Sequence, residues 1–310
     1  NGNPVSLTVA GLVPNALNQE SLSSAANGEV WLSGTNTYSG GTYLAGGAVG
    51  FVTDRNFGAY PAAPDPDNIT VLSGYNAIRA NGATMINTNR GILLANNPVL
   101  MLSQQAGGTA LTVAGDITGN GYVVTSPGQD GLVILTGSNT FSGVIEVESN
   151  LRAYEGAGLS PNANLKLGDT GQRGMLETTG TFTRALGAGP GQVQWSANNA
   201  YIGAYNNGGF AAVGGPLTVN IGGNTNVLVW NTNALAMGQF AYGQLCLQDG
   251  NATAPLTWLD PIDFAGGNRT IANNQALNGA APTIMAGTLF NGSLSKGWGG
   301  LLWLTATNSL

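Results

Sequence analysis

A motif that returns three times along the chain limits the architectures open to it. Residues 28–44 read GEVWLSGTNTYSGGTYL, residues 131–147 read GLVILTGSNTFSGVIEV, and residues 299–310, GGLLWLTATNSL, repeat the first part of the motif. Recurrence at long intervals is typical of solenoids, in which each unit buries its apolar face only against its neighbours. A solenoid coil takes about 20 to 30 residues, so the intervals leave room for several coils each.

The motif alternates as a β-strand does and then turns. Apolar side chains occupy every second position of its first part, which is the period of a strand with one buried face. We therefore expect the following side chains to be buried: Val30, Leu32, Val133, Leu135, Leu302 and Leu304. A Gly-x-Asn-Thr turn follows, which predicts that Asn36 and Asn139 lie at coil corners. Stacked asparagines can hydrogen-bond to their copies in neighbouring coils.

The composition agrees with many short strands joined by turns. The 310 residues include 49 glycines, only 8 % are charged, and 43 % are hydrophobic. Glycine, asparagine and proline suit turns and destabilise helix interiors, while the hydrophobic share is sufficient for a core. We predict an all-β fold with less than about a tenth of the residues in helices, against a usual third.

The element L-S/T-G-x-N-T-Y/F-S-G-G, at residues 32–41 and 135–144, resembles the autotransporter-associated β-strand repeat of secreted bacterial surface proteins. Val144 and Ala306 depart from the family's pattern, which has glycine at both positions. Residues near 181–286 are similar to the longer spacer between such repeats. The resemblance implies a right-handed parallel β-helix, or β-solenoid, located at the bacterial cell surface. We predict one continuous domain over residues 1–310, a single elongated rod.

Charge and cysteine content exclude some partners. The net charge is −6 and the only lysines are Lys166 and Lys296, whereas nucleic-acid binding requires a basic face. No apolar run reaches the roughly 18 to 20 residues of a membrane-spanning helix, so we predict no membrane insertion of this segment. The single cysteine, Cys246, cannot form an intrachain disulfide, and we interpret it as a buried, inert thiol.

Catalytic motifs are scarce. The chain has no histidine, which excludes Ser-His-Asp and Cys-His arrangements and histidine metal sites. The pattern S-x-x-K at residues 293–296 has no companion motifs. We therefore predict no enzyme activity, no cofactor and no metal.

Paired carboxylates require separate attention, because polysaccharide lyases and hydrolases built on parallel β-helices place two carboxyl groups across a groove. Three pairs are close in sequence: Glu146 with Glu148, Asp65 with Asp67, and Asp260 with Asp263. The fifteen acids are spread over the whole chain, so we interpret these carboxylates as outward-facing groups that keep the protein soluble. A polysaccharide-cleaving enzyme is the third and weakest hypothesis.

Aromatic residues gather in the spacer. They are Trp195, Tyr201, Tyr205, Phe210, Trp230, Phe240, Tyr242 and Trp258. Aromatic rings fill cores and corners, and exposed rings can also stack on sugars. Core filling explains most of them, while the sugar-binding interpretation supports an alternative function: an adhesin passenger domain that binds surface glycans.

Both ends of the chain have strand patterns without a recognisable cap. A terminal coil exposes unpaired backbone and a slice of core unless something covers it. The candidate self-assembly residues are Val5, Leu7, Val9, Leu301, Leu302, Trp303 and Leu304. Either the chain is a fragment of a longer passenger, or other copies cover its ends and form a head-to-tail filament. We favour the second hypothesis, a non-catalytic extracellular structural protein whose main partner is itself.

Overall fold

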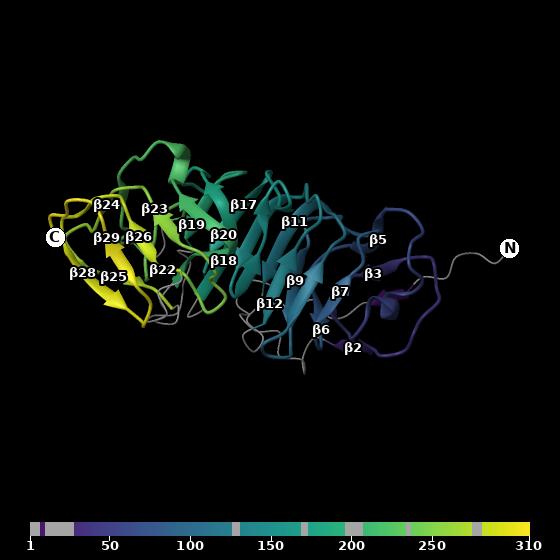
Figure 1. Cartoon of the computed structure of the whole chain (residues 1–310). Coiled ribbons are helices and arrows are strands. Elements are labelled where there is room, and N and C mark those ends of the chain that lie inside the picture. The colour runs from purple at the N-terminus through teal and green to yellow at the C-terminus, as the bar shows by residue number, and fades with distance from the viewer. Residues whose placement is uncertain are drawn as a thin grey trace. The chain divides into compact units, whose positions relative to one another are not determined.

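The computed structural model describes residues 7–9, 28–125, 131–168, 173–195, 207–233, 237–274 and 281–310. Its sheets are stacks of parallel strands (Figure 1), so the predicted all-β class and parallel β-solenoid are confirmed. Within these ranges the helices are two short 3-10 turns, η1 (Asp54–Phe57) and η2 (Ile221–Gly223), in agreement with the low helix content expected. No helix in the same ranges is long and apolar enough to cross a membrane.

The chain divides into two compact units. Unit 1 contains Asn1–Ile145 and Ser149–Ala163, and unit 2 contains Glu146–Glu148 and Asn164–Leu310. The single continuous domain expected over residues 1–310 stays a prediction.

Unit 1 has three walls of parallel strands. Wall A contains β1 (Leu7–Val9), β3 (Thr42–Leu44), β5 (Asp65–Val71), β8 (Arg90–Leu94) and the first part of β11 (Ile117–Thr125). Wall B contains β2 (Glu29–Leu32), β4 (Gly47–Phe51), β6 (Tyr75–Ala80), β9 (Val99–Gln104) and the last part of β11. Wall C contains β7 (Thr84–Ile86), β10 (Ala110–Val113), β12 (Leu132–Leu135) and β14 (Asn150–Arg152). Strand β13 (Ser142–Val147) pairs with β11, and β15 (Tyr154–Glu155) pairs with β16 (Gly158–Leu159).

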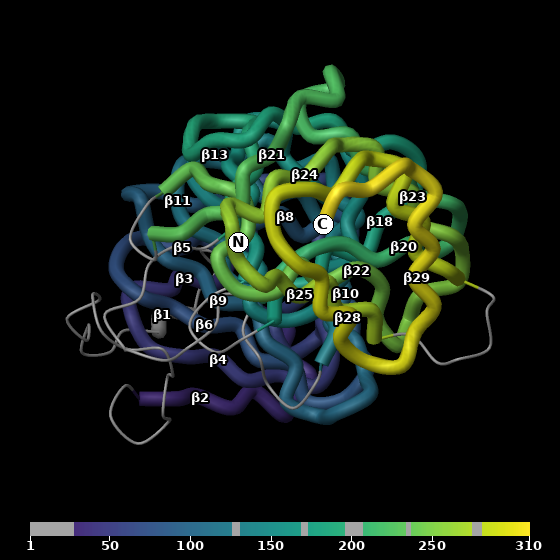
Figure 2. Tube along the Cα trace, turned by 90° about the vertical axis from the view of Figure 1, so that its left-hand side faces the viewer, coloured from purple at the N-terminus to yellow at the C-terminus, as the bar shows by residue number. Residues whose placement is uncertain are grey.

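Unit 2 repeats this plan. Wall D contains β18 (Arg173–Phe182), β20 (Asn207–Val219), β22 (Leu245–Leu247), β25 (Asn268–Ala272) and β28 (Ser293–Gly297). Wall E joins the last part of β20 to β23 (Leu256–Trp258), β26 (Thr283–Met285) and β29 (Leu302–Leu304). Wall F contains β21 (Leu228–Val229), β24 (Ile262–Asp263) and β27 (Leu289–Phe290), and β17 (Ala163–Leu167) pairs with β19 (Val193–Trp195). Figure 2 shows the last coil, in yellow, passing through β28 and β29.

The coil length agrees with the expected 20 to 30 residues. In unit 1 the hydrogen-bonded side chains of Ser142 and Asn120 are 22 residues apart, and in unit 2 those of Ser295 and Asn268 are 27 apart and those of Asn291 and Asp263 are 28 apart. Because the strands stack in parallel and in register, side chains that point inward form columns along the solenoid. Leu111 lies over Val133, and Val113 over Leu135, and all four are buried. Period-two alternation in the sequence thus becomes a continuous core.

Aromatic rings form the core of unit 2. Seven buried rings touch one another in a chain of edge-on and tilted contacts with centroids 4.7 to 6.5 Å apart; they are Phe182, Trp195, Phe210, Trp230, Phe240, Trp258 and Phe264. Core filling is therefore confirmed for the spacer aromatics among them. Tyr242 is half-buried, and Tyr201 and Tyr205 lie outside the described residues.

The expected burial of the motif is confirmed only in its second copy. Val133 and Leu135 are buried, Leu32 and Leu302 are half-buried, and the expectation for Val30 and Leu304 is wrong, since each is 41 % exposed. The reason is position. Strand β12 lies between β10 and β14, whereas β2 and β29 each have one neighbouring strand among the described residues.

The first copy of the motif lies in a different wall from the second, although the two sequences are similar. Strand β2 pairs with β4 in wall B, whereas β12, from the same part of the motif, belongs to wall C. Trp31 packs closely on Gly50, its neighbour in β4, because a Cβ added at Gly50 would lie 2.4 Å from the Trp31 ring. The ring therefore uses the space left by a glycine that the motif does not contain.

Candidate functional site

The outer surface of the last coil is the candidate site. Leu301 is 36 % exposed, Trp303 49 % and Leu304 41 %, with Leu302 half-buried between them. Strand β29 pairs with β26 on one edge and has no second partner in the described part of the chain. At the other end of the sequence, Leu7 and Val9 lie in β1, which pairs with β3. Val5 lies outside the described residues.

The second copy of the motif shows what covers such a surface. Leu135 and Leu304 occupy the same position in the motif, yet Leu135 is fully buried while Leu304 is 41 % exposed. Strand β14 lies on β12, with Leu151 directly opposite Val133. The exposure of Leu304 therefore measures the apolar surface that one further coil would remove from water.

The turn after β29 has the same structure as the turn after β12. The Thr136 and Thr305 N–H groups donate to the preceding coil at Val113 and Met285, with distances of 3.1 and 3.0 Å. The Thr140 and Ser309 N–H groups also donate to that coil, each at 3.0 Å. Copies 131–147 and 299–310 therefore build the same corner, although the chain departs from the repeat pattern at position 306.

The corner asparagine joins coils through the backbone. Asn139 Oδ1 accepts the N–H of Ile117 in the preceding coil at 2.7 Å, and its Nδ2 donates to the Gly158 carbonyl in the following coil, also at 2.7 Å. The predicted corner position of Asn139 is confirmed. Its partners are main-chain groups rather than a second asparagine. The one side-chain amide accepts from an N–H of the preceding coil and donates to a carbonyl of the following coil.

Asn308 makes half of this pattern. Its Oδ1 accepts the N–H of Leu289 in the preceding coil at 2.8 Å, and its Nδ2 donates to Ala306 within its own turn at 2.9 Å. Asn36 makes the other half, because its Nδ2 donates to the Asn56 carbonyl at 2.7 Å. Asn308 was not among the residues selected from the sequence, although it holds the same position in the third copy of the motif as Asn139 does in the second.

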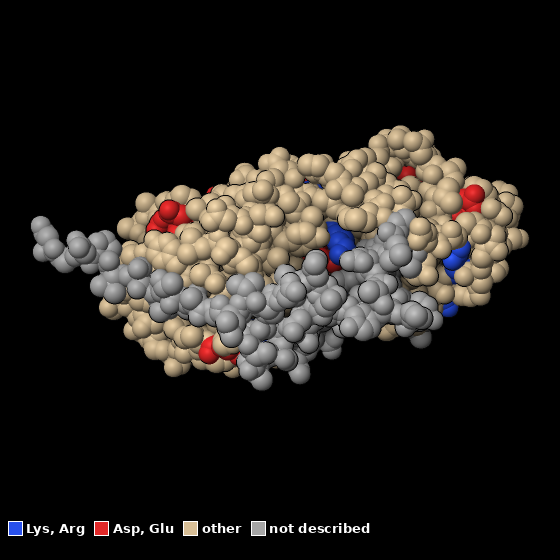
Figure 3. All heavy atoms as spheres, turned by 180° about the vertical axis from the view of Figure 1, so that it is seen from behind, with Lys and Arg blue, Asp and Glu red and all other residues tan. Residues whose placement is uncertain are grey.

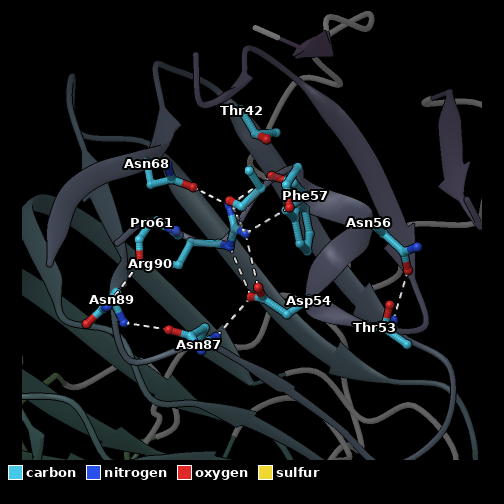
Figure 4. A network of polar contacts seen from close by, with 12 residues as sticks. Thr42, Thr53, Asp54, Asn56, Phe57, Pro61, Asn68, Asn87, Asn89 and Arg90 are labelled. Atoms are coloured by element: carbon cyan, nitrogen blue, oxygen red, sulfur yellow. Dashed lines mark hydrogen bonds and ion pairs between the residues drawn. The ribbon is translucent and has the colours of Figure 1, made fainter. Parts of the chain in front are cut away.

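The most extensive charged network belongs to the core of unit 1. Arg90 is fully buried and its guanidinium holds the Asp54 carboxylate with two hydrogen bonds of 3.0 Å (Figure 4). The same group donates to the Phe57 and Ala59 carbonyls at 2.8 and 3.1 Å and to Asn68 Oδ1. These bonds hold η1 and the loop after it in place. In the described residues this coil has no strand in wall C, so the hydrogen bonds of the network replace those of a strand. The role of the network is therefore structural.

The carboxylates singled out in the sequence do not converge. Glu146 is buried and accepts a hydrogen bond from Lys166, and Asp260 is fully buried, so the interpretation of both as outward-facing is wrong. Glu148, Asp65 and Asp263 are half-buried, and Asp67 is exposed as expected. The solenoid buries two of these acids because each has a partner in an adjacent coil. Figure 3 shows how few charged side chains interrupt one face of the molecule.

A buried pair of acids in unit 2 was missed. Asn251 connects them, because its Nδ2 donates to Glu177 Oε1 at 2.6 Å and its N–H donates to Asp249 Oδ1 at 2.9 Å. Burial and the neighbouring Glu177 charge raise the pKa of Asp249 to about 7. Both carboxyl groups are shielded from solvent, so neither can reach a polymeric substrate. The two acids are far apart in sequence and belong to no recognisable motif, so the sequence alone did not predict the pair.

Two other buried groups have raised pKa values. Asp260 Oδ2 accepts the Ile221 N–H at 2.8 Å, while its Oδ1 finds no partner among the described residues. Burial raises the pKa of Asp260 to about 6. Burial also raises the pKa of Cys246 to about 12, so the thiol stays protonated at neutral pH and the interpretation of a buried, inert cysteine is supported.

Comparisons with known proteins do not assign this chain to a family: no family model, no curated protein and no solved structure matches it. The fold itself places it among parallel β-solenoids.

Proposed function

We propose that this chain is a non-catalytic, extracellular structural protein whose copies stack head to tail into a surface filament or scaffold. The observation that carries the proposal is the exposed core position Leu304, whose counterpart Leu135 is fully buried. The resemblance of the motif to the autotransporter-associated repeat supports the bacterial cell surface as its location.

The energetics favour a durable contact. Burying what remains exposed of Leu302, Trp303 and Leu304, which is less than half of their surface, is worth about 2 to 4 kcal/mol before the costs of ordering. Backbone hydrogen bonds along β29 would add about 1 kcal/mol each. A head-to-tail contact does not close on itself, so every copy repeats this gain and the assembly grows in length.

The alternative function, an adhesin, has less support. Its proposed sugar platform consisted of the spacer aromatics, and five of them, Trp195, Phe210, Trp230, Phe240 and Trp258, are buried in the core. A buried ring cannot stack on a sugar. The enzyme hypothesis also loses ground, because Glu146 and Asp260 face the protein interior rather than a groove.

Charges on the last coil should prevent assembly. We expect the double variant Leu302→Asp with Leu304→Asp to be monomeric by multi-angle light scattering at concentrations where the unaltered chain forms large particles, because a carboxylate cannot enter a partner's core without a large desolvation cost. The far-UV CD spectrum should keep its β content.

The matched control places the same two charges at exposed apolar residues elsewhere, Val229→Asp with Met237→Asp, which are 55 % and 65 % exposed. This control should assemble as the unaltered chain does. Particles of unchanged size from the Leu302 and Leu304 variant would show that the last coil is not the contact and would refute the proposal.

A further inference from the structure

Strand β2 leaves core positions of wall B exposed, as β29 does in wall E. Val30 and Leu32 pair with Val49 and Phe51 of β4, and the side chains of both β4 residues are fully buried. Because in-register residues of parallel strands share one face of the sheet, Val30 and Leu32 also point toward the core. Val30 is nevertheless 41 % exposed and Leu32 is half-buried, since β4 is the one strand beside β2 in the described residues.

The open edge of β29 presents the backbone groups of Leu302 and Leu304. The Leu301 carbonyl and the Thr305 N–H both bond to β26, at 2.9 and 3.0 Å. Successive residues of a strand direct their backbone groups to opposite edges. The N–H and carbonyl groups of Leu302 and Leu304 therefore face away from β26, where a further strand would pair with them.

The open edge of β2 presents a matching set. The Gly28 carbonyl bonds to β4 at 3.0 Å, so by the same alternation the backbone groups of Glu29 and Trp31 face away from β4. In a parallel pair, each residue bonds to the two neighbours of the residue opposite it. Leu302 therefore fits between Glu29 and Trp31, which places Val30 directly opposite it. The backbone alone would also allow a shift by two residues.

The corner asparagines select one of these registers. In two coils the asparagine Oδ1 accepts an N–H of the preceding coil: Asn139 accepts that of Ile117 at 2.7 Å, and Asn308 accepts that of Leu289 at 2.8 Å. Leu289 lies directly opposite Asn308, because the next residues, Phe290 and Ser309, form a bridge. An asparagine at this corner thus bonds to the residue at the same position one coil earlier.

Asn36 and Asn308 each lack one bond of this ladder. Asn36 Nδ2 donates to the following coil at 2.7 Å, whereas its Oδ1 has no partner in the described residues. The Asn308 N–H likewise has no acceptor in that part of the chain. The free acceptor faces the open edge of wall B, because the two polar atoms of an amide point in different directions.

We propose that β2 of a second copy pairs in parallel with β29 of the first, with Asn36 opposite Asn308. The Asn36 amide oxygen of the second copy accepts the Asn308 N–H of the first and continues the ladder. This inference rests on the proposed head-to-tail assembly and specifies its contact surface and register. The register places the exposed core positions of the two strands opposite each other: Val30 and Leu32 on one side, Leu302 and Leu304 on the other.

The same register joins two exposed tryptophans. Trp31 is 41 % exposed and Trp303 49 %, and each lies between two core positions of its strand, so both rings point outward. In-register stacking of parallel strands brings identical side chains side by side. The second copy of the motif, which β14 covers within the chain, has Ile134 at this position. Tryptophan thus occurs in the two copies of the motif whose strands have an open edge.

Two blocked variants test the junction. Val30→Asp with Leu32→Asp blocks the β2 side, and Leu302→Asp with Leu304→Asp blocks the β29 side, because a carboxylate at a core position carries a large desolvation cost. Each variant alone should be monomeric by multi-angle light scattering. A mixture should form dimers with one copy of each variant and nothing larger, because each variant keeps the surface that the other has lost.

The matched control for the β2 side is Tyr60→Asp with Met85→Asp, at residues of unit 1 that are 46 % and 51 % exposed. It should assemble as the unaltered chain does. Dimers in the mixture also show that both blocked variants are folded, and far-UV CD gives an independent measure of their β content.

Disulfide trapping tests the register. Ser33 and Thr305 are exposed and lie opposite each other in the proposed pairing, at the roughly 4.8 Å between neighbouring strands that a disulfide can span. Ser33→Cys and Thr305→Cys preparations, mixed under mild oxidation, should give a reducible dimer that needs both. Buried Cys246 does not compete. The control pairs Ser33→Cys with Thr307→Cys, which only a register shifted by two residues would bring together.

The outcomes separate the two proposals. Dimers in the mixture of blocked variants, with cross-linking of Ser33 to Thr305, support the junction. Assembly by the Val30 and Leu32 variant alone, monomers in the mixture, or cross-linking of the control pair at equal yield refutes the junction and leaves the filament standing. A chain that never assembles refutes both.

Discussion

Replacing Arg90 with leucine should lower the free energy of unfolding by about 3 to 5 kcal/mol, the usual cost of removing one partner from a buried ion pair. Among the described residues, the buried Asp54 side chain would then keep one donor, the Asn87 N–H at 2.9 Å. The carbonyls of Phe57 and Ala59 would also lose their donor. The variant therefore removes the contacts that hold η1 against β8.

Urea denaturation followed by far-UV CD measures this loss. Arg55→Leu is the matched control, because Arg55 is exposed and its guanidinium carbon lies over the Tyr60 ring, 4.4 Å from the ring centroid. It should cost less than about 1 kcal/mol. Equal losses in the two variants would mean that the buried network does not hold the coil.

The protein should be less stable at pH 8 than at pH 5. Burial raises the pKa of Asp249 to about 7 and of Asp260 to about 6, against 3.8 for the ordinary carboxyl. Below about pH 3 both groups are largely protonated in the folded and the unfolded chain. As the pH rises from there, the unfolded chain loses these protons first, so folding becomes less favourable until the folded groups ionise as well.

Asp260→Asn should remove its share of this dependence. At pH 8 the variant should be more stable than the unaltered chain by about 2 to 3 kcal/mol, since each pKa unit corresponds to about 1.4 kcal/mol. Below about pH 3 the two proteins should be equally stable, and the amide still accepts the Ile221 N–H. Asp67→Asn, at an exposed carboxylate, should leave the profile unchanged. A stabilisation independent of pH would contradict the assignment to Asp260.

The fold followed from the sequence because its signals are local. Alternation in the motif, together with turn residues every few positions, was sufficient to predict stacked short strands and the burial of Val133 and Leu135. The turn also placed Asn139 correctly. These features depend on neighbouring residues and on the in-register stacking that all coils share.

Contacts between coils could not be predicted in the same way. Asp54 and Arg90 are 36 residues apart, and Glu177 is 74 residues from the asparagine that contacts it. Which residues meet depends on the exact length of each intervening coil. The same uncertainty explains why β2 lies in wall B despite its motif, and why Glu146 and Asp260 are buried rather than solvated.

Electron microscopy of the intact 310-residue chain tests the central claim, that its copies assemble end to end. Negative-stain images over a range of concentrations should show unbranched filaments that lengthen with concentration, and the Leu302→Asp, Leu304→Asp variant on the same grids should show single particles. Uniform single particles of the unaltered chain at every concentration, with its β content intact, would contradict the claim.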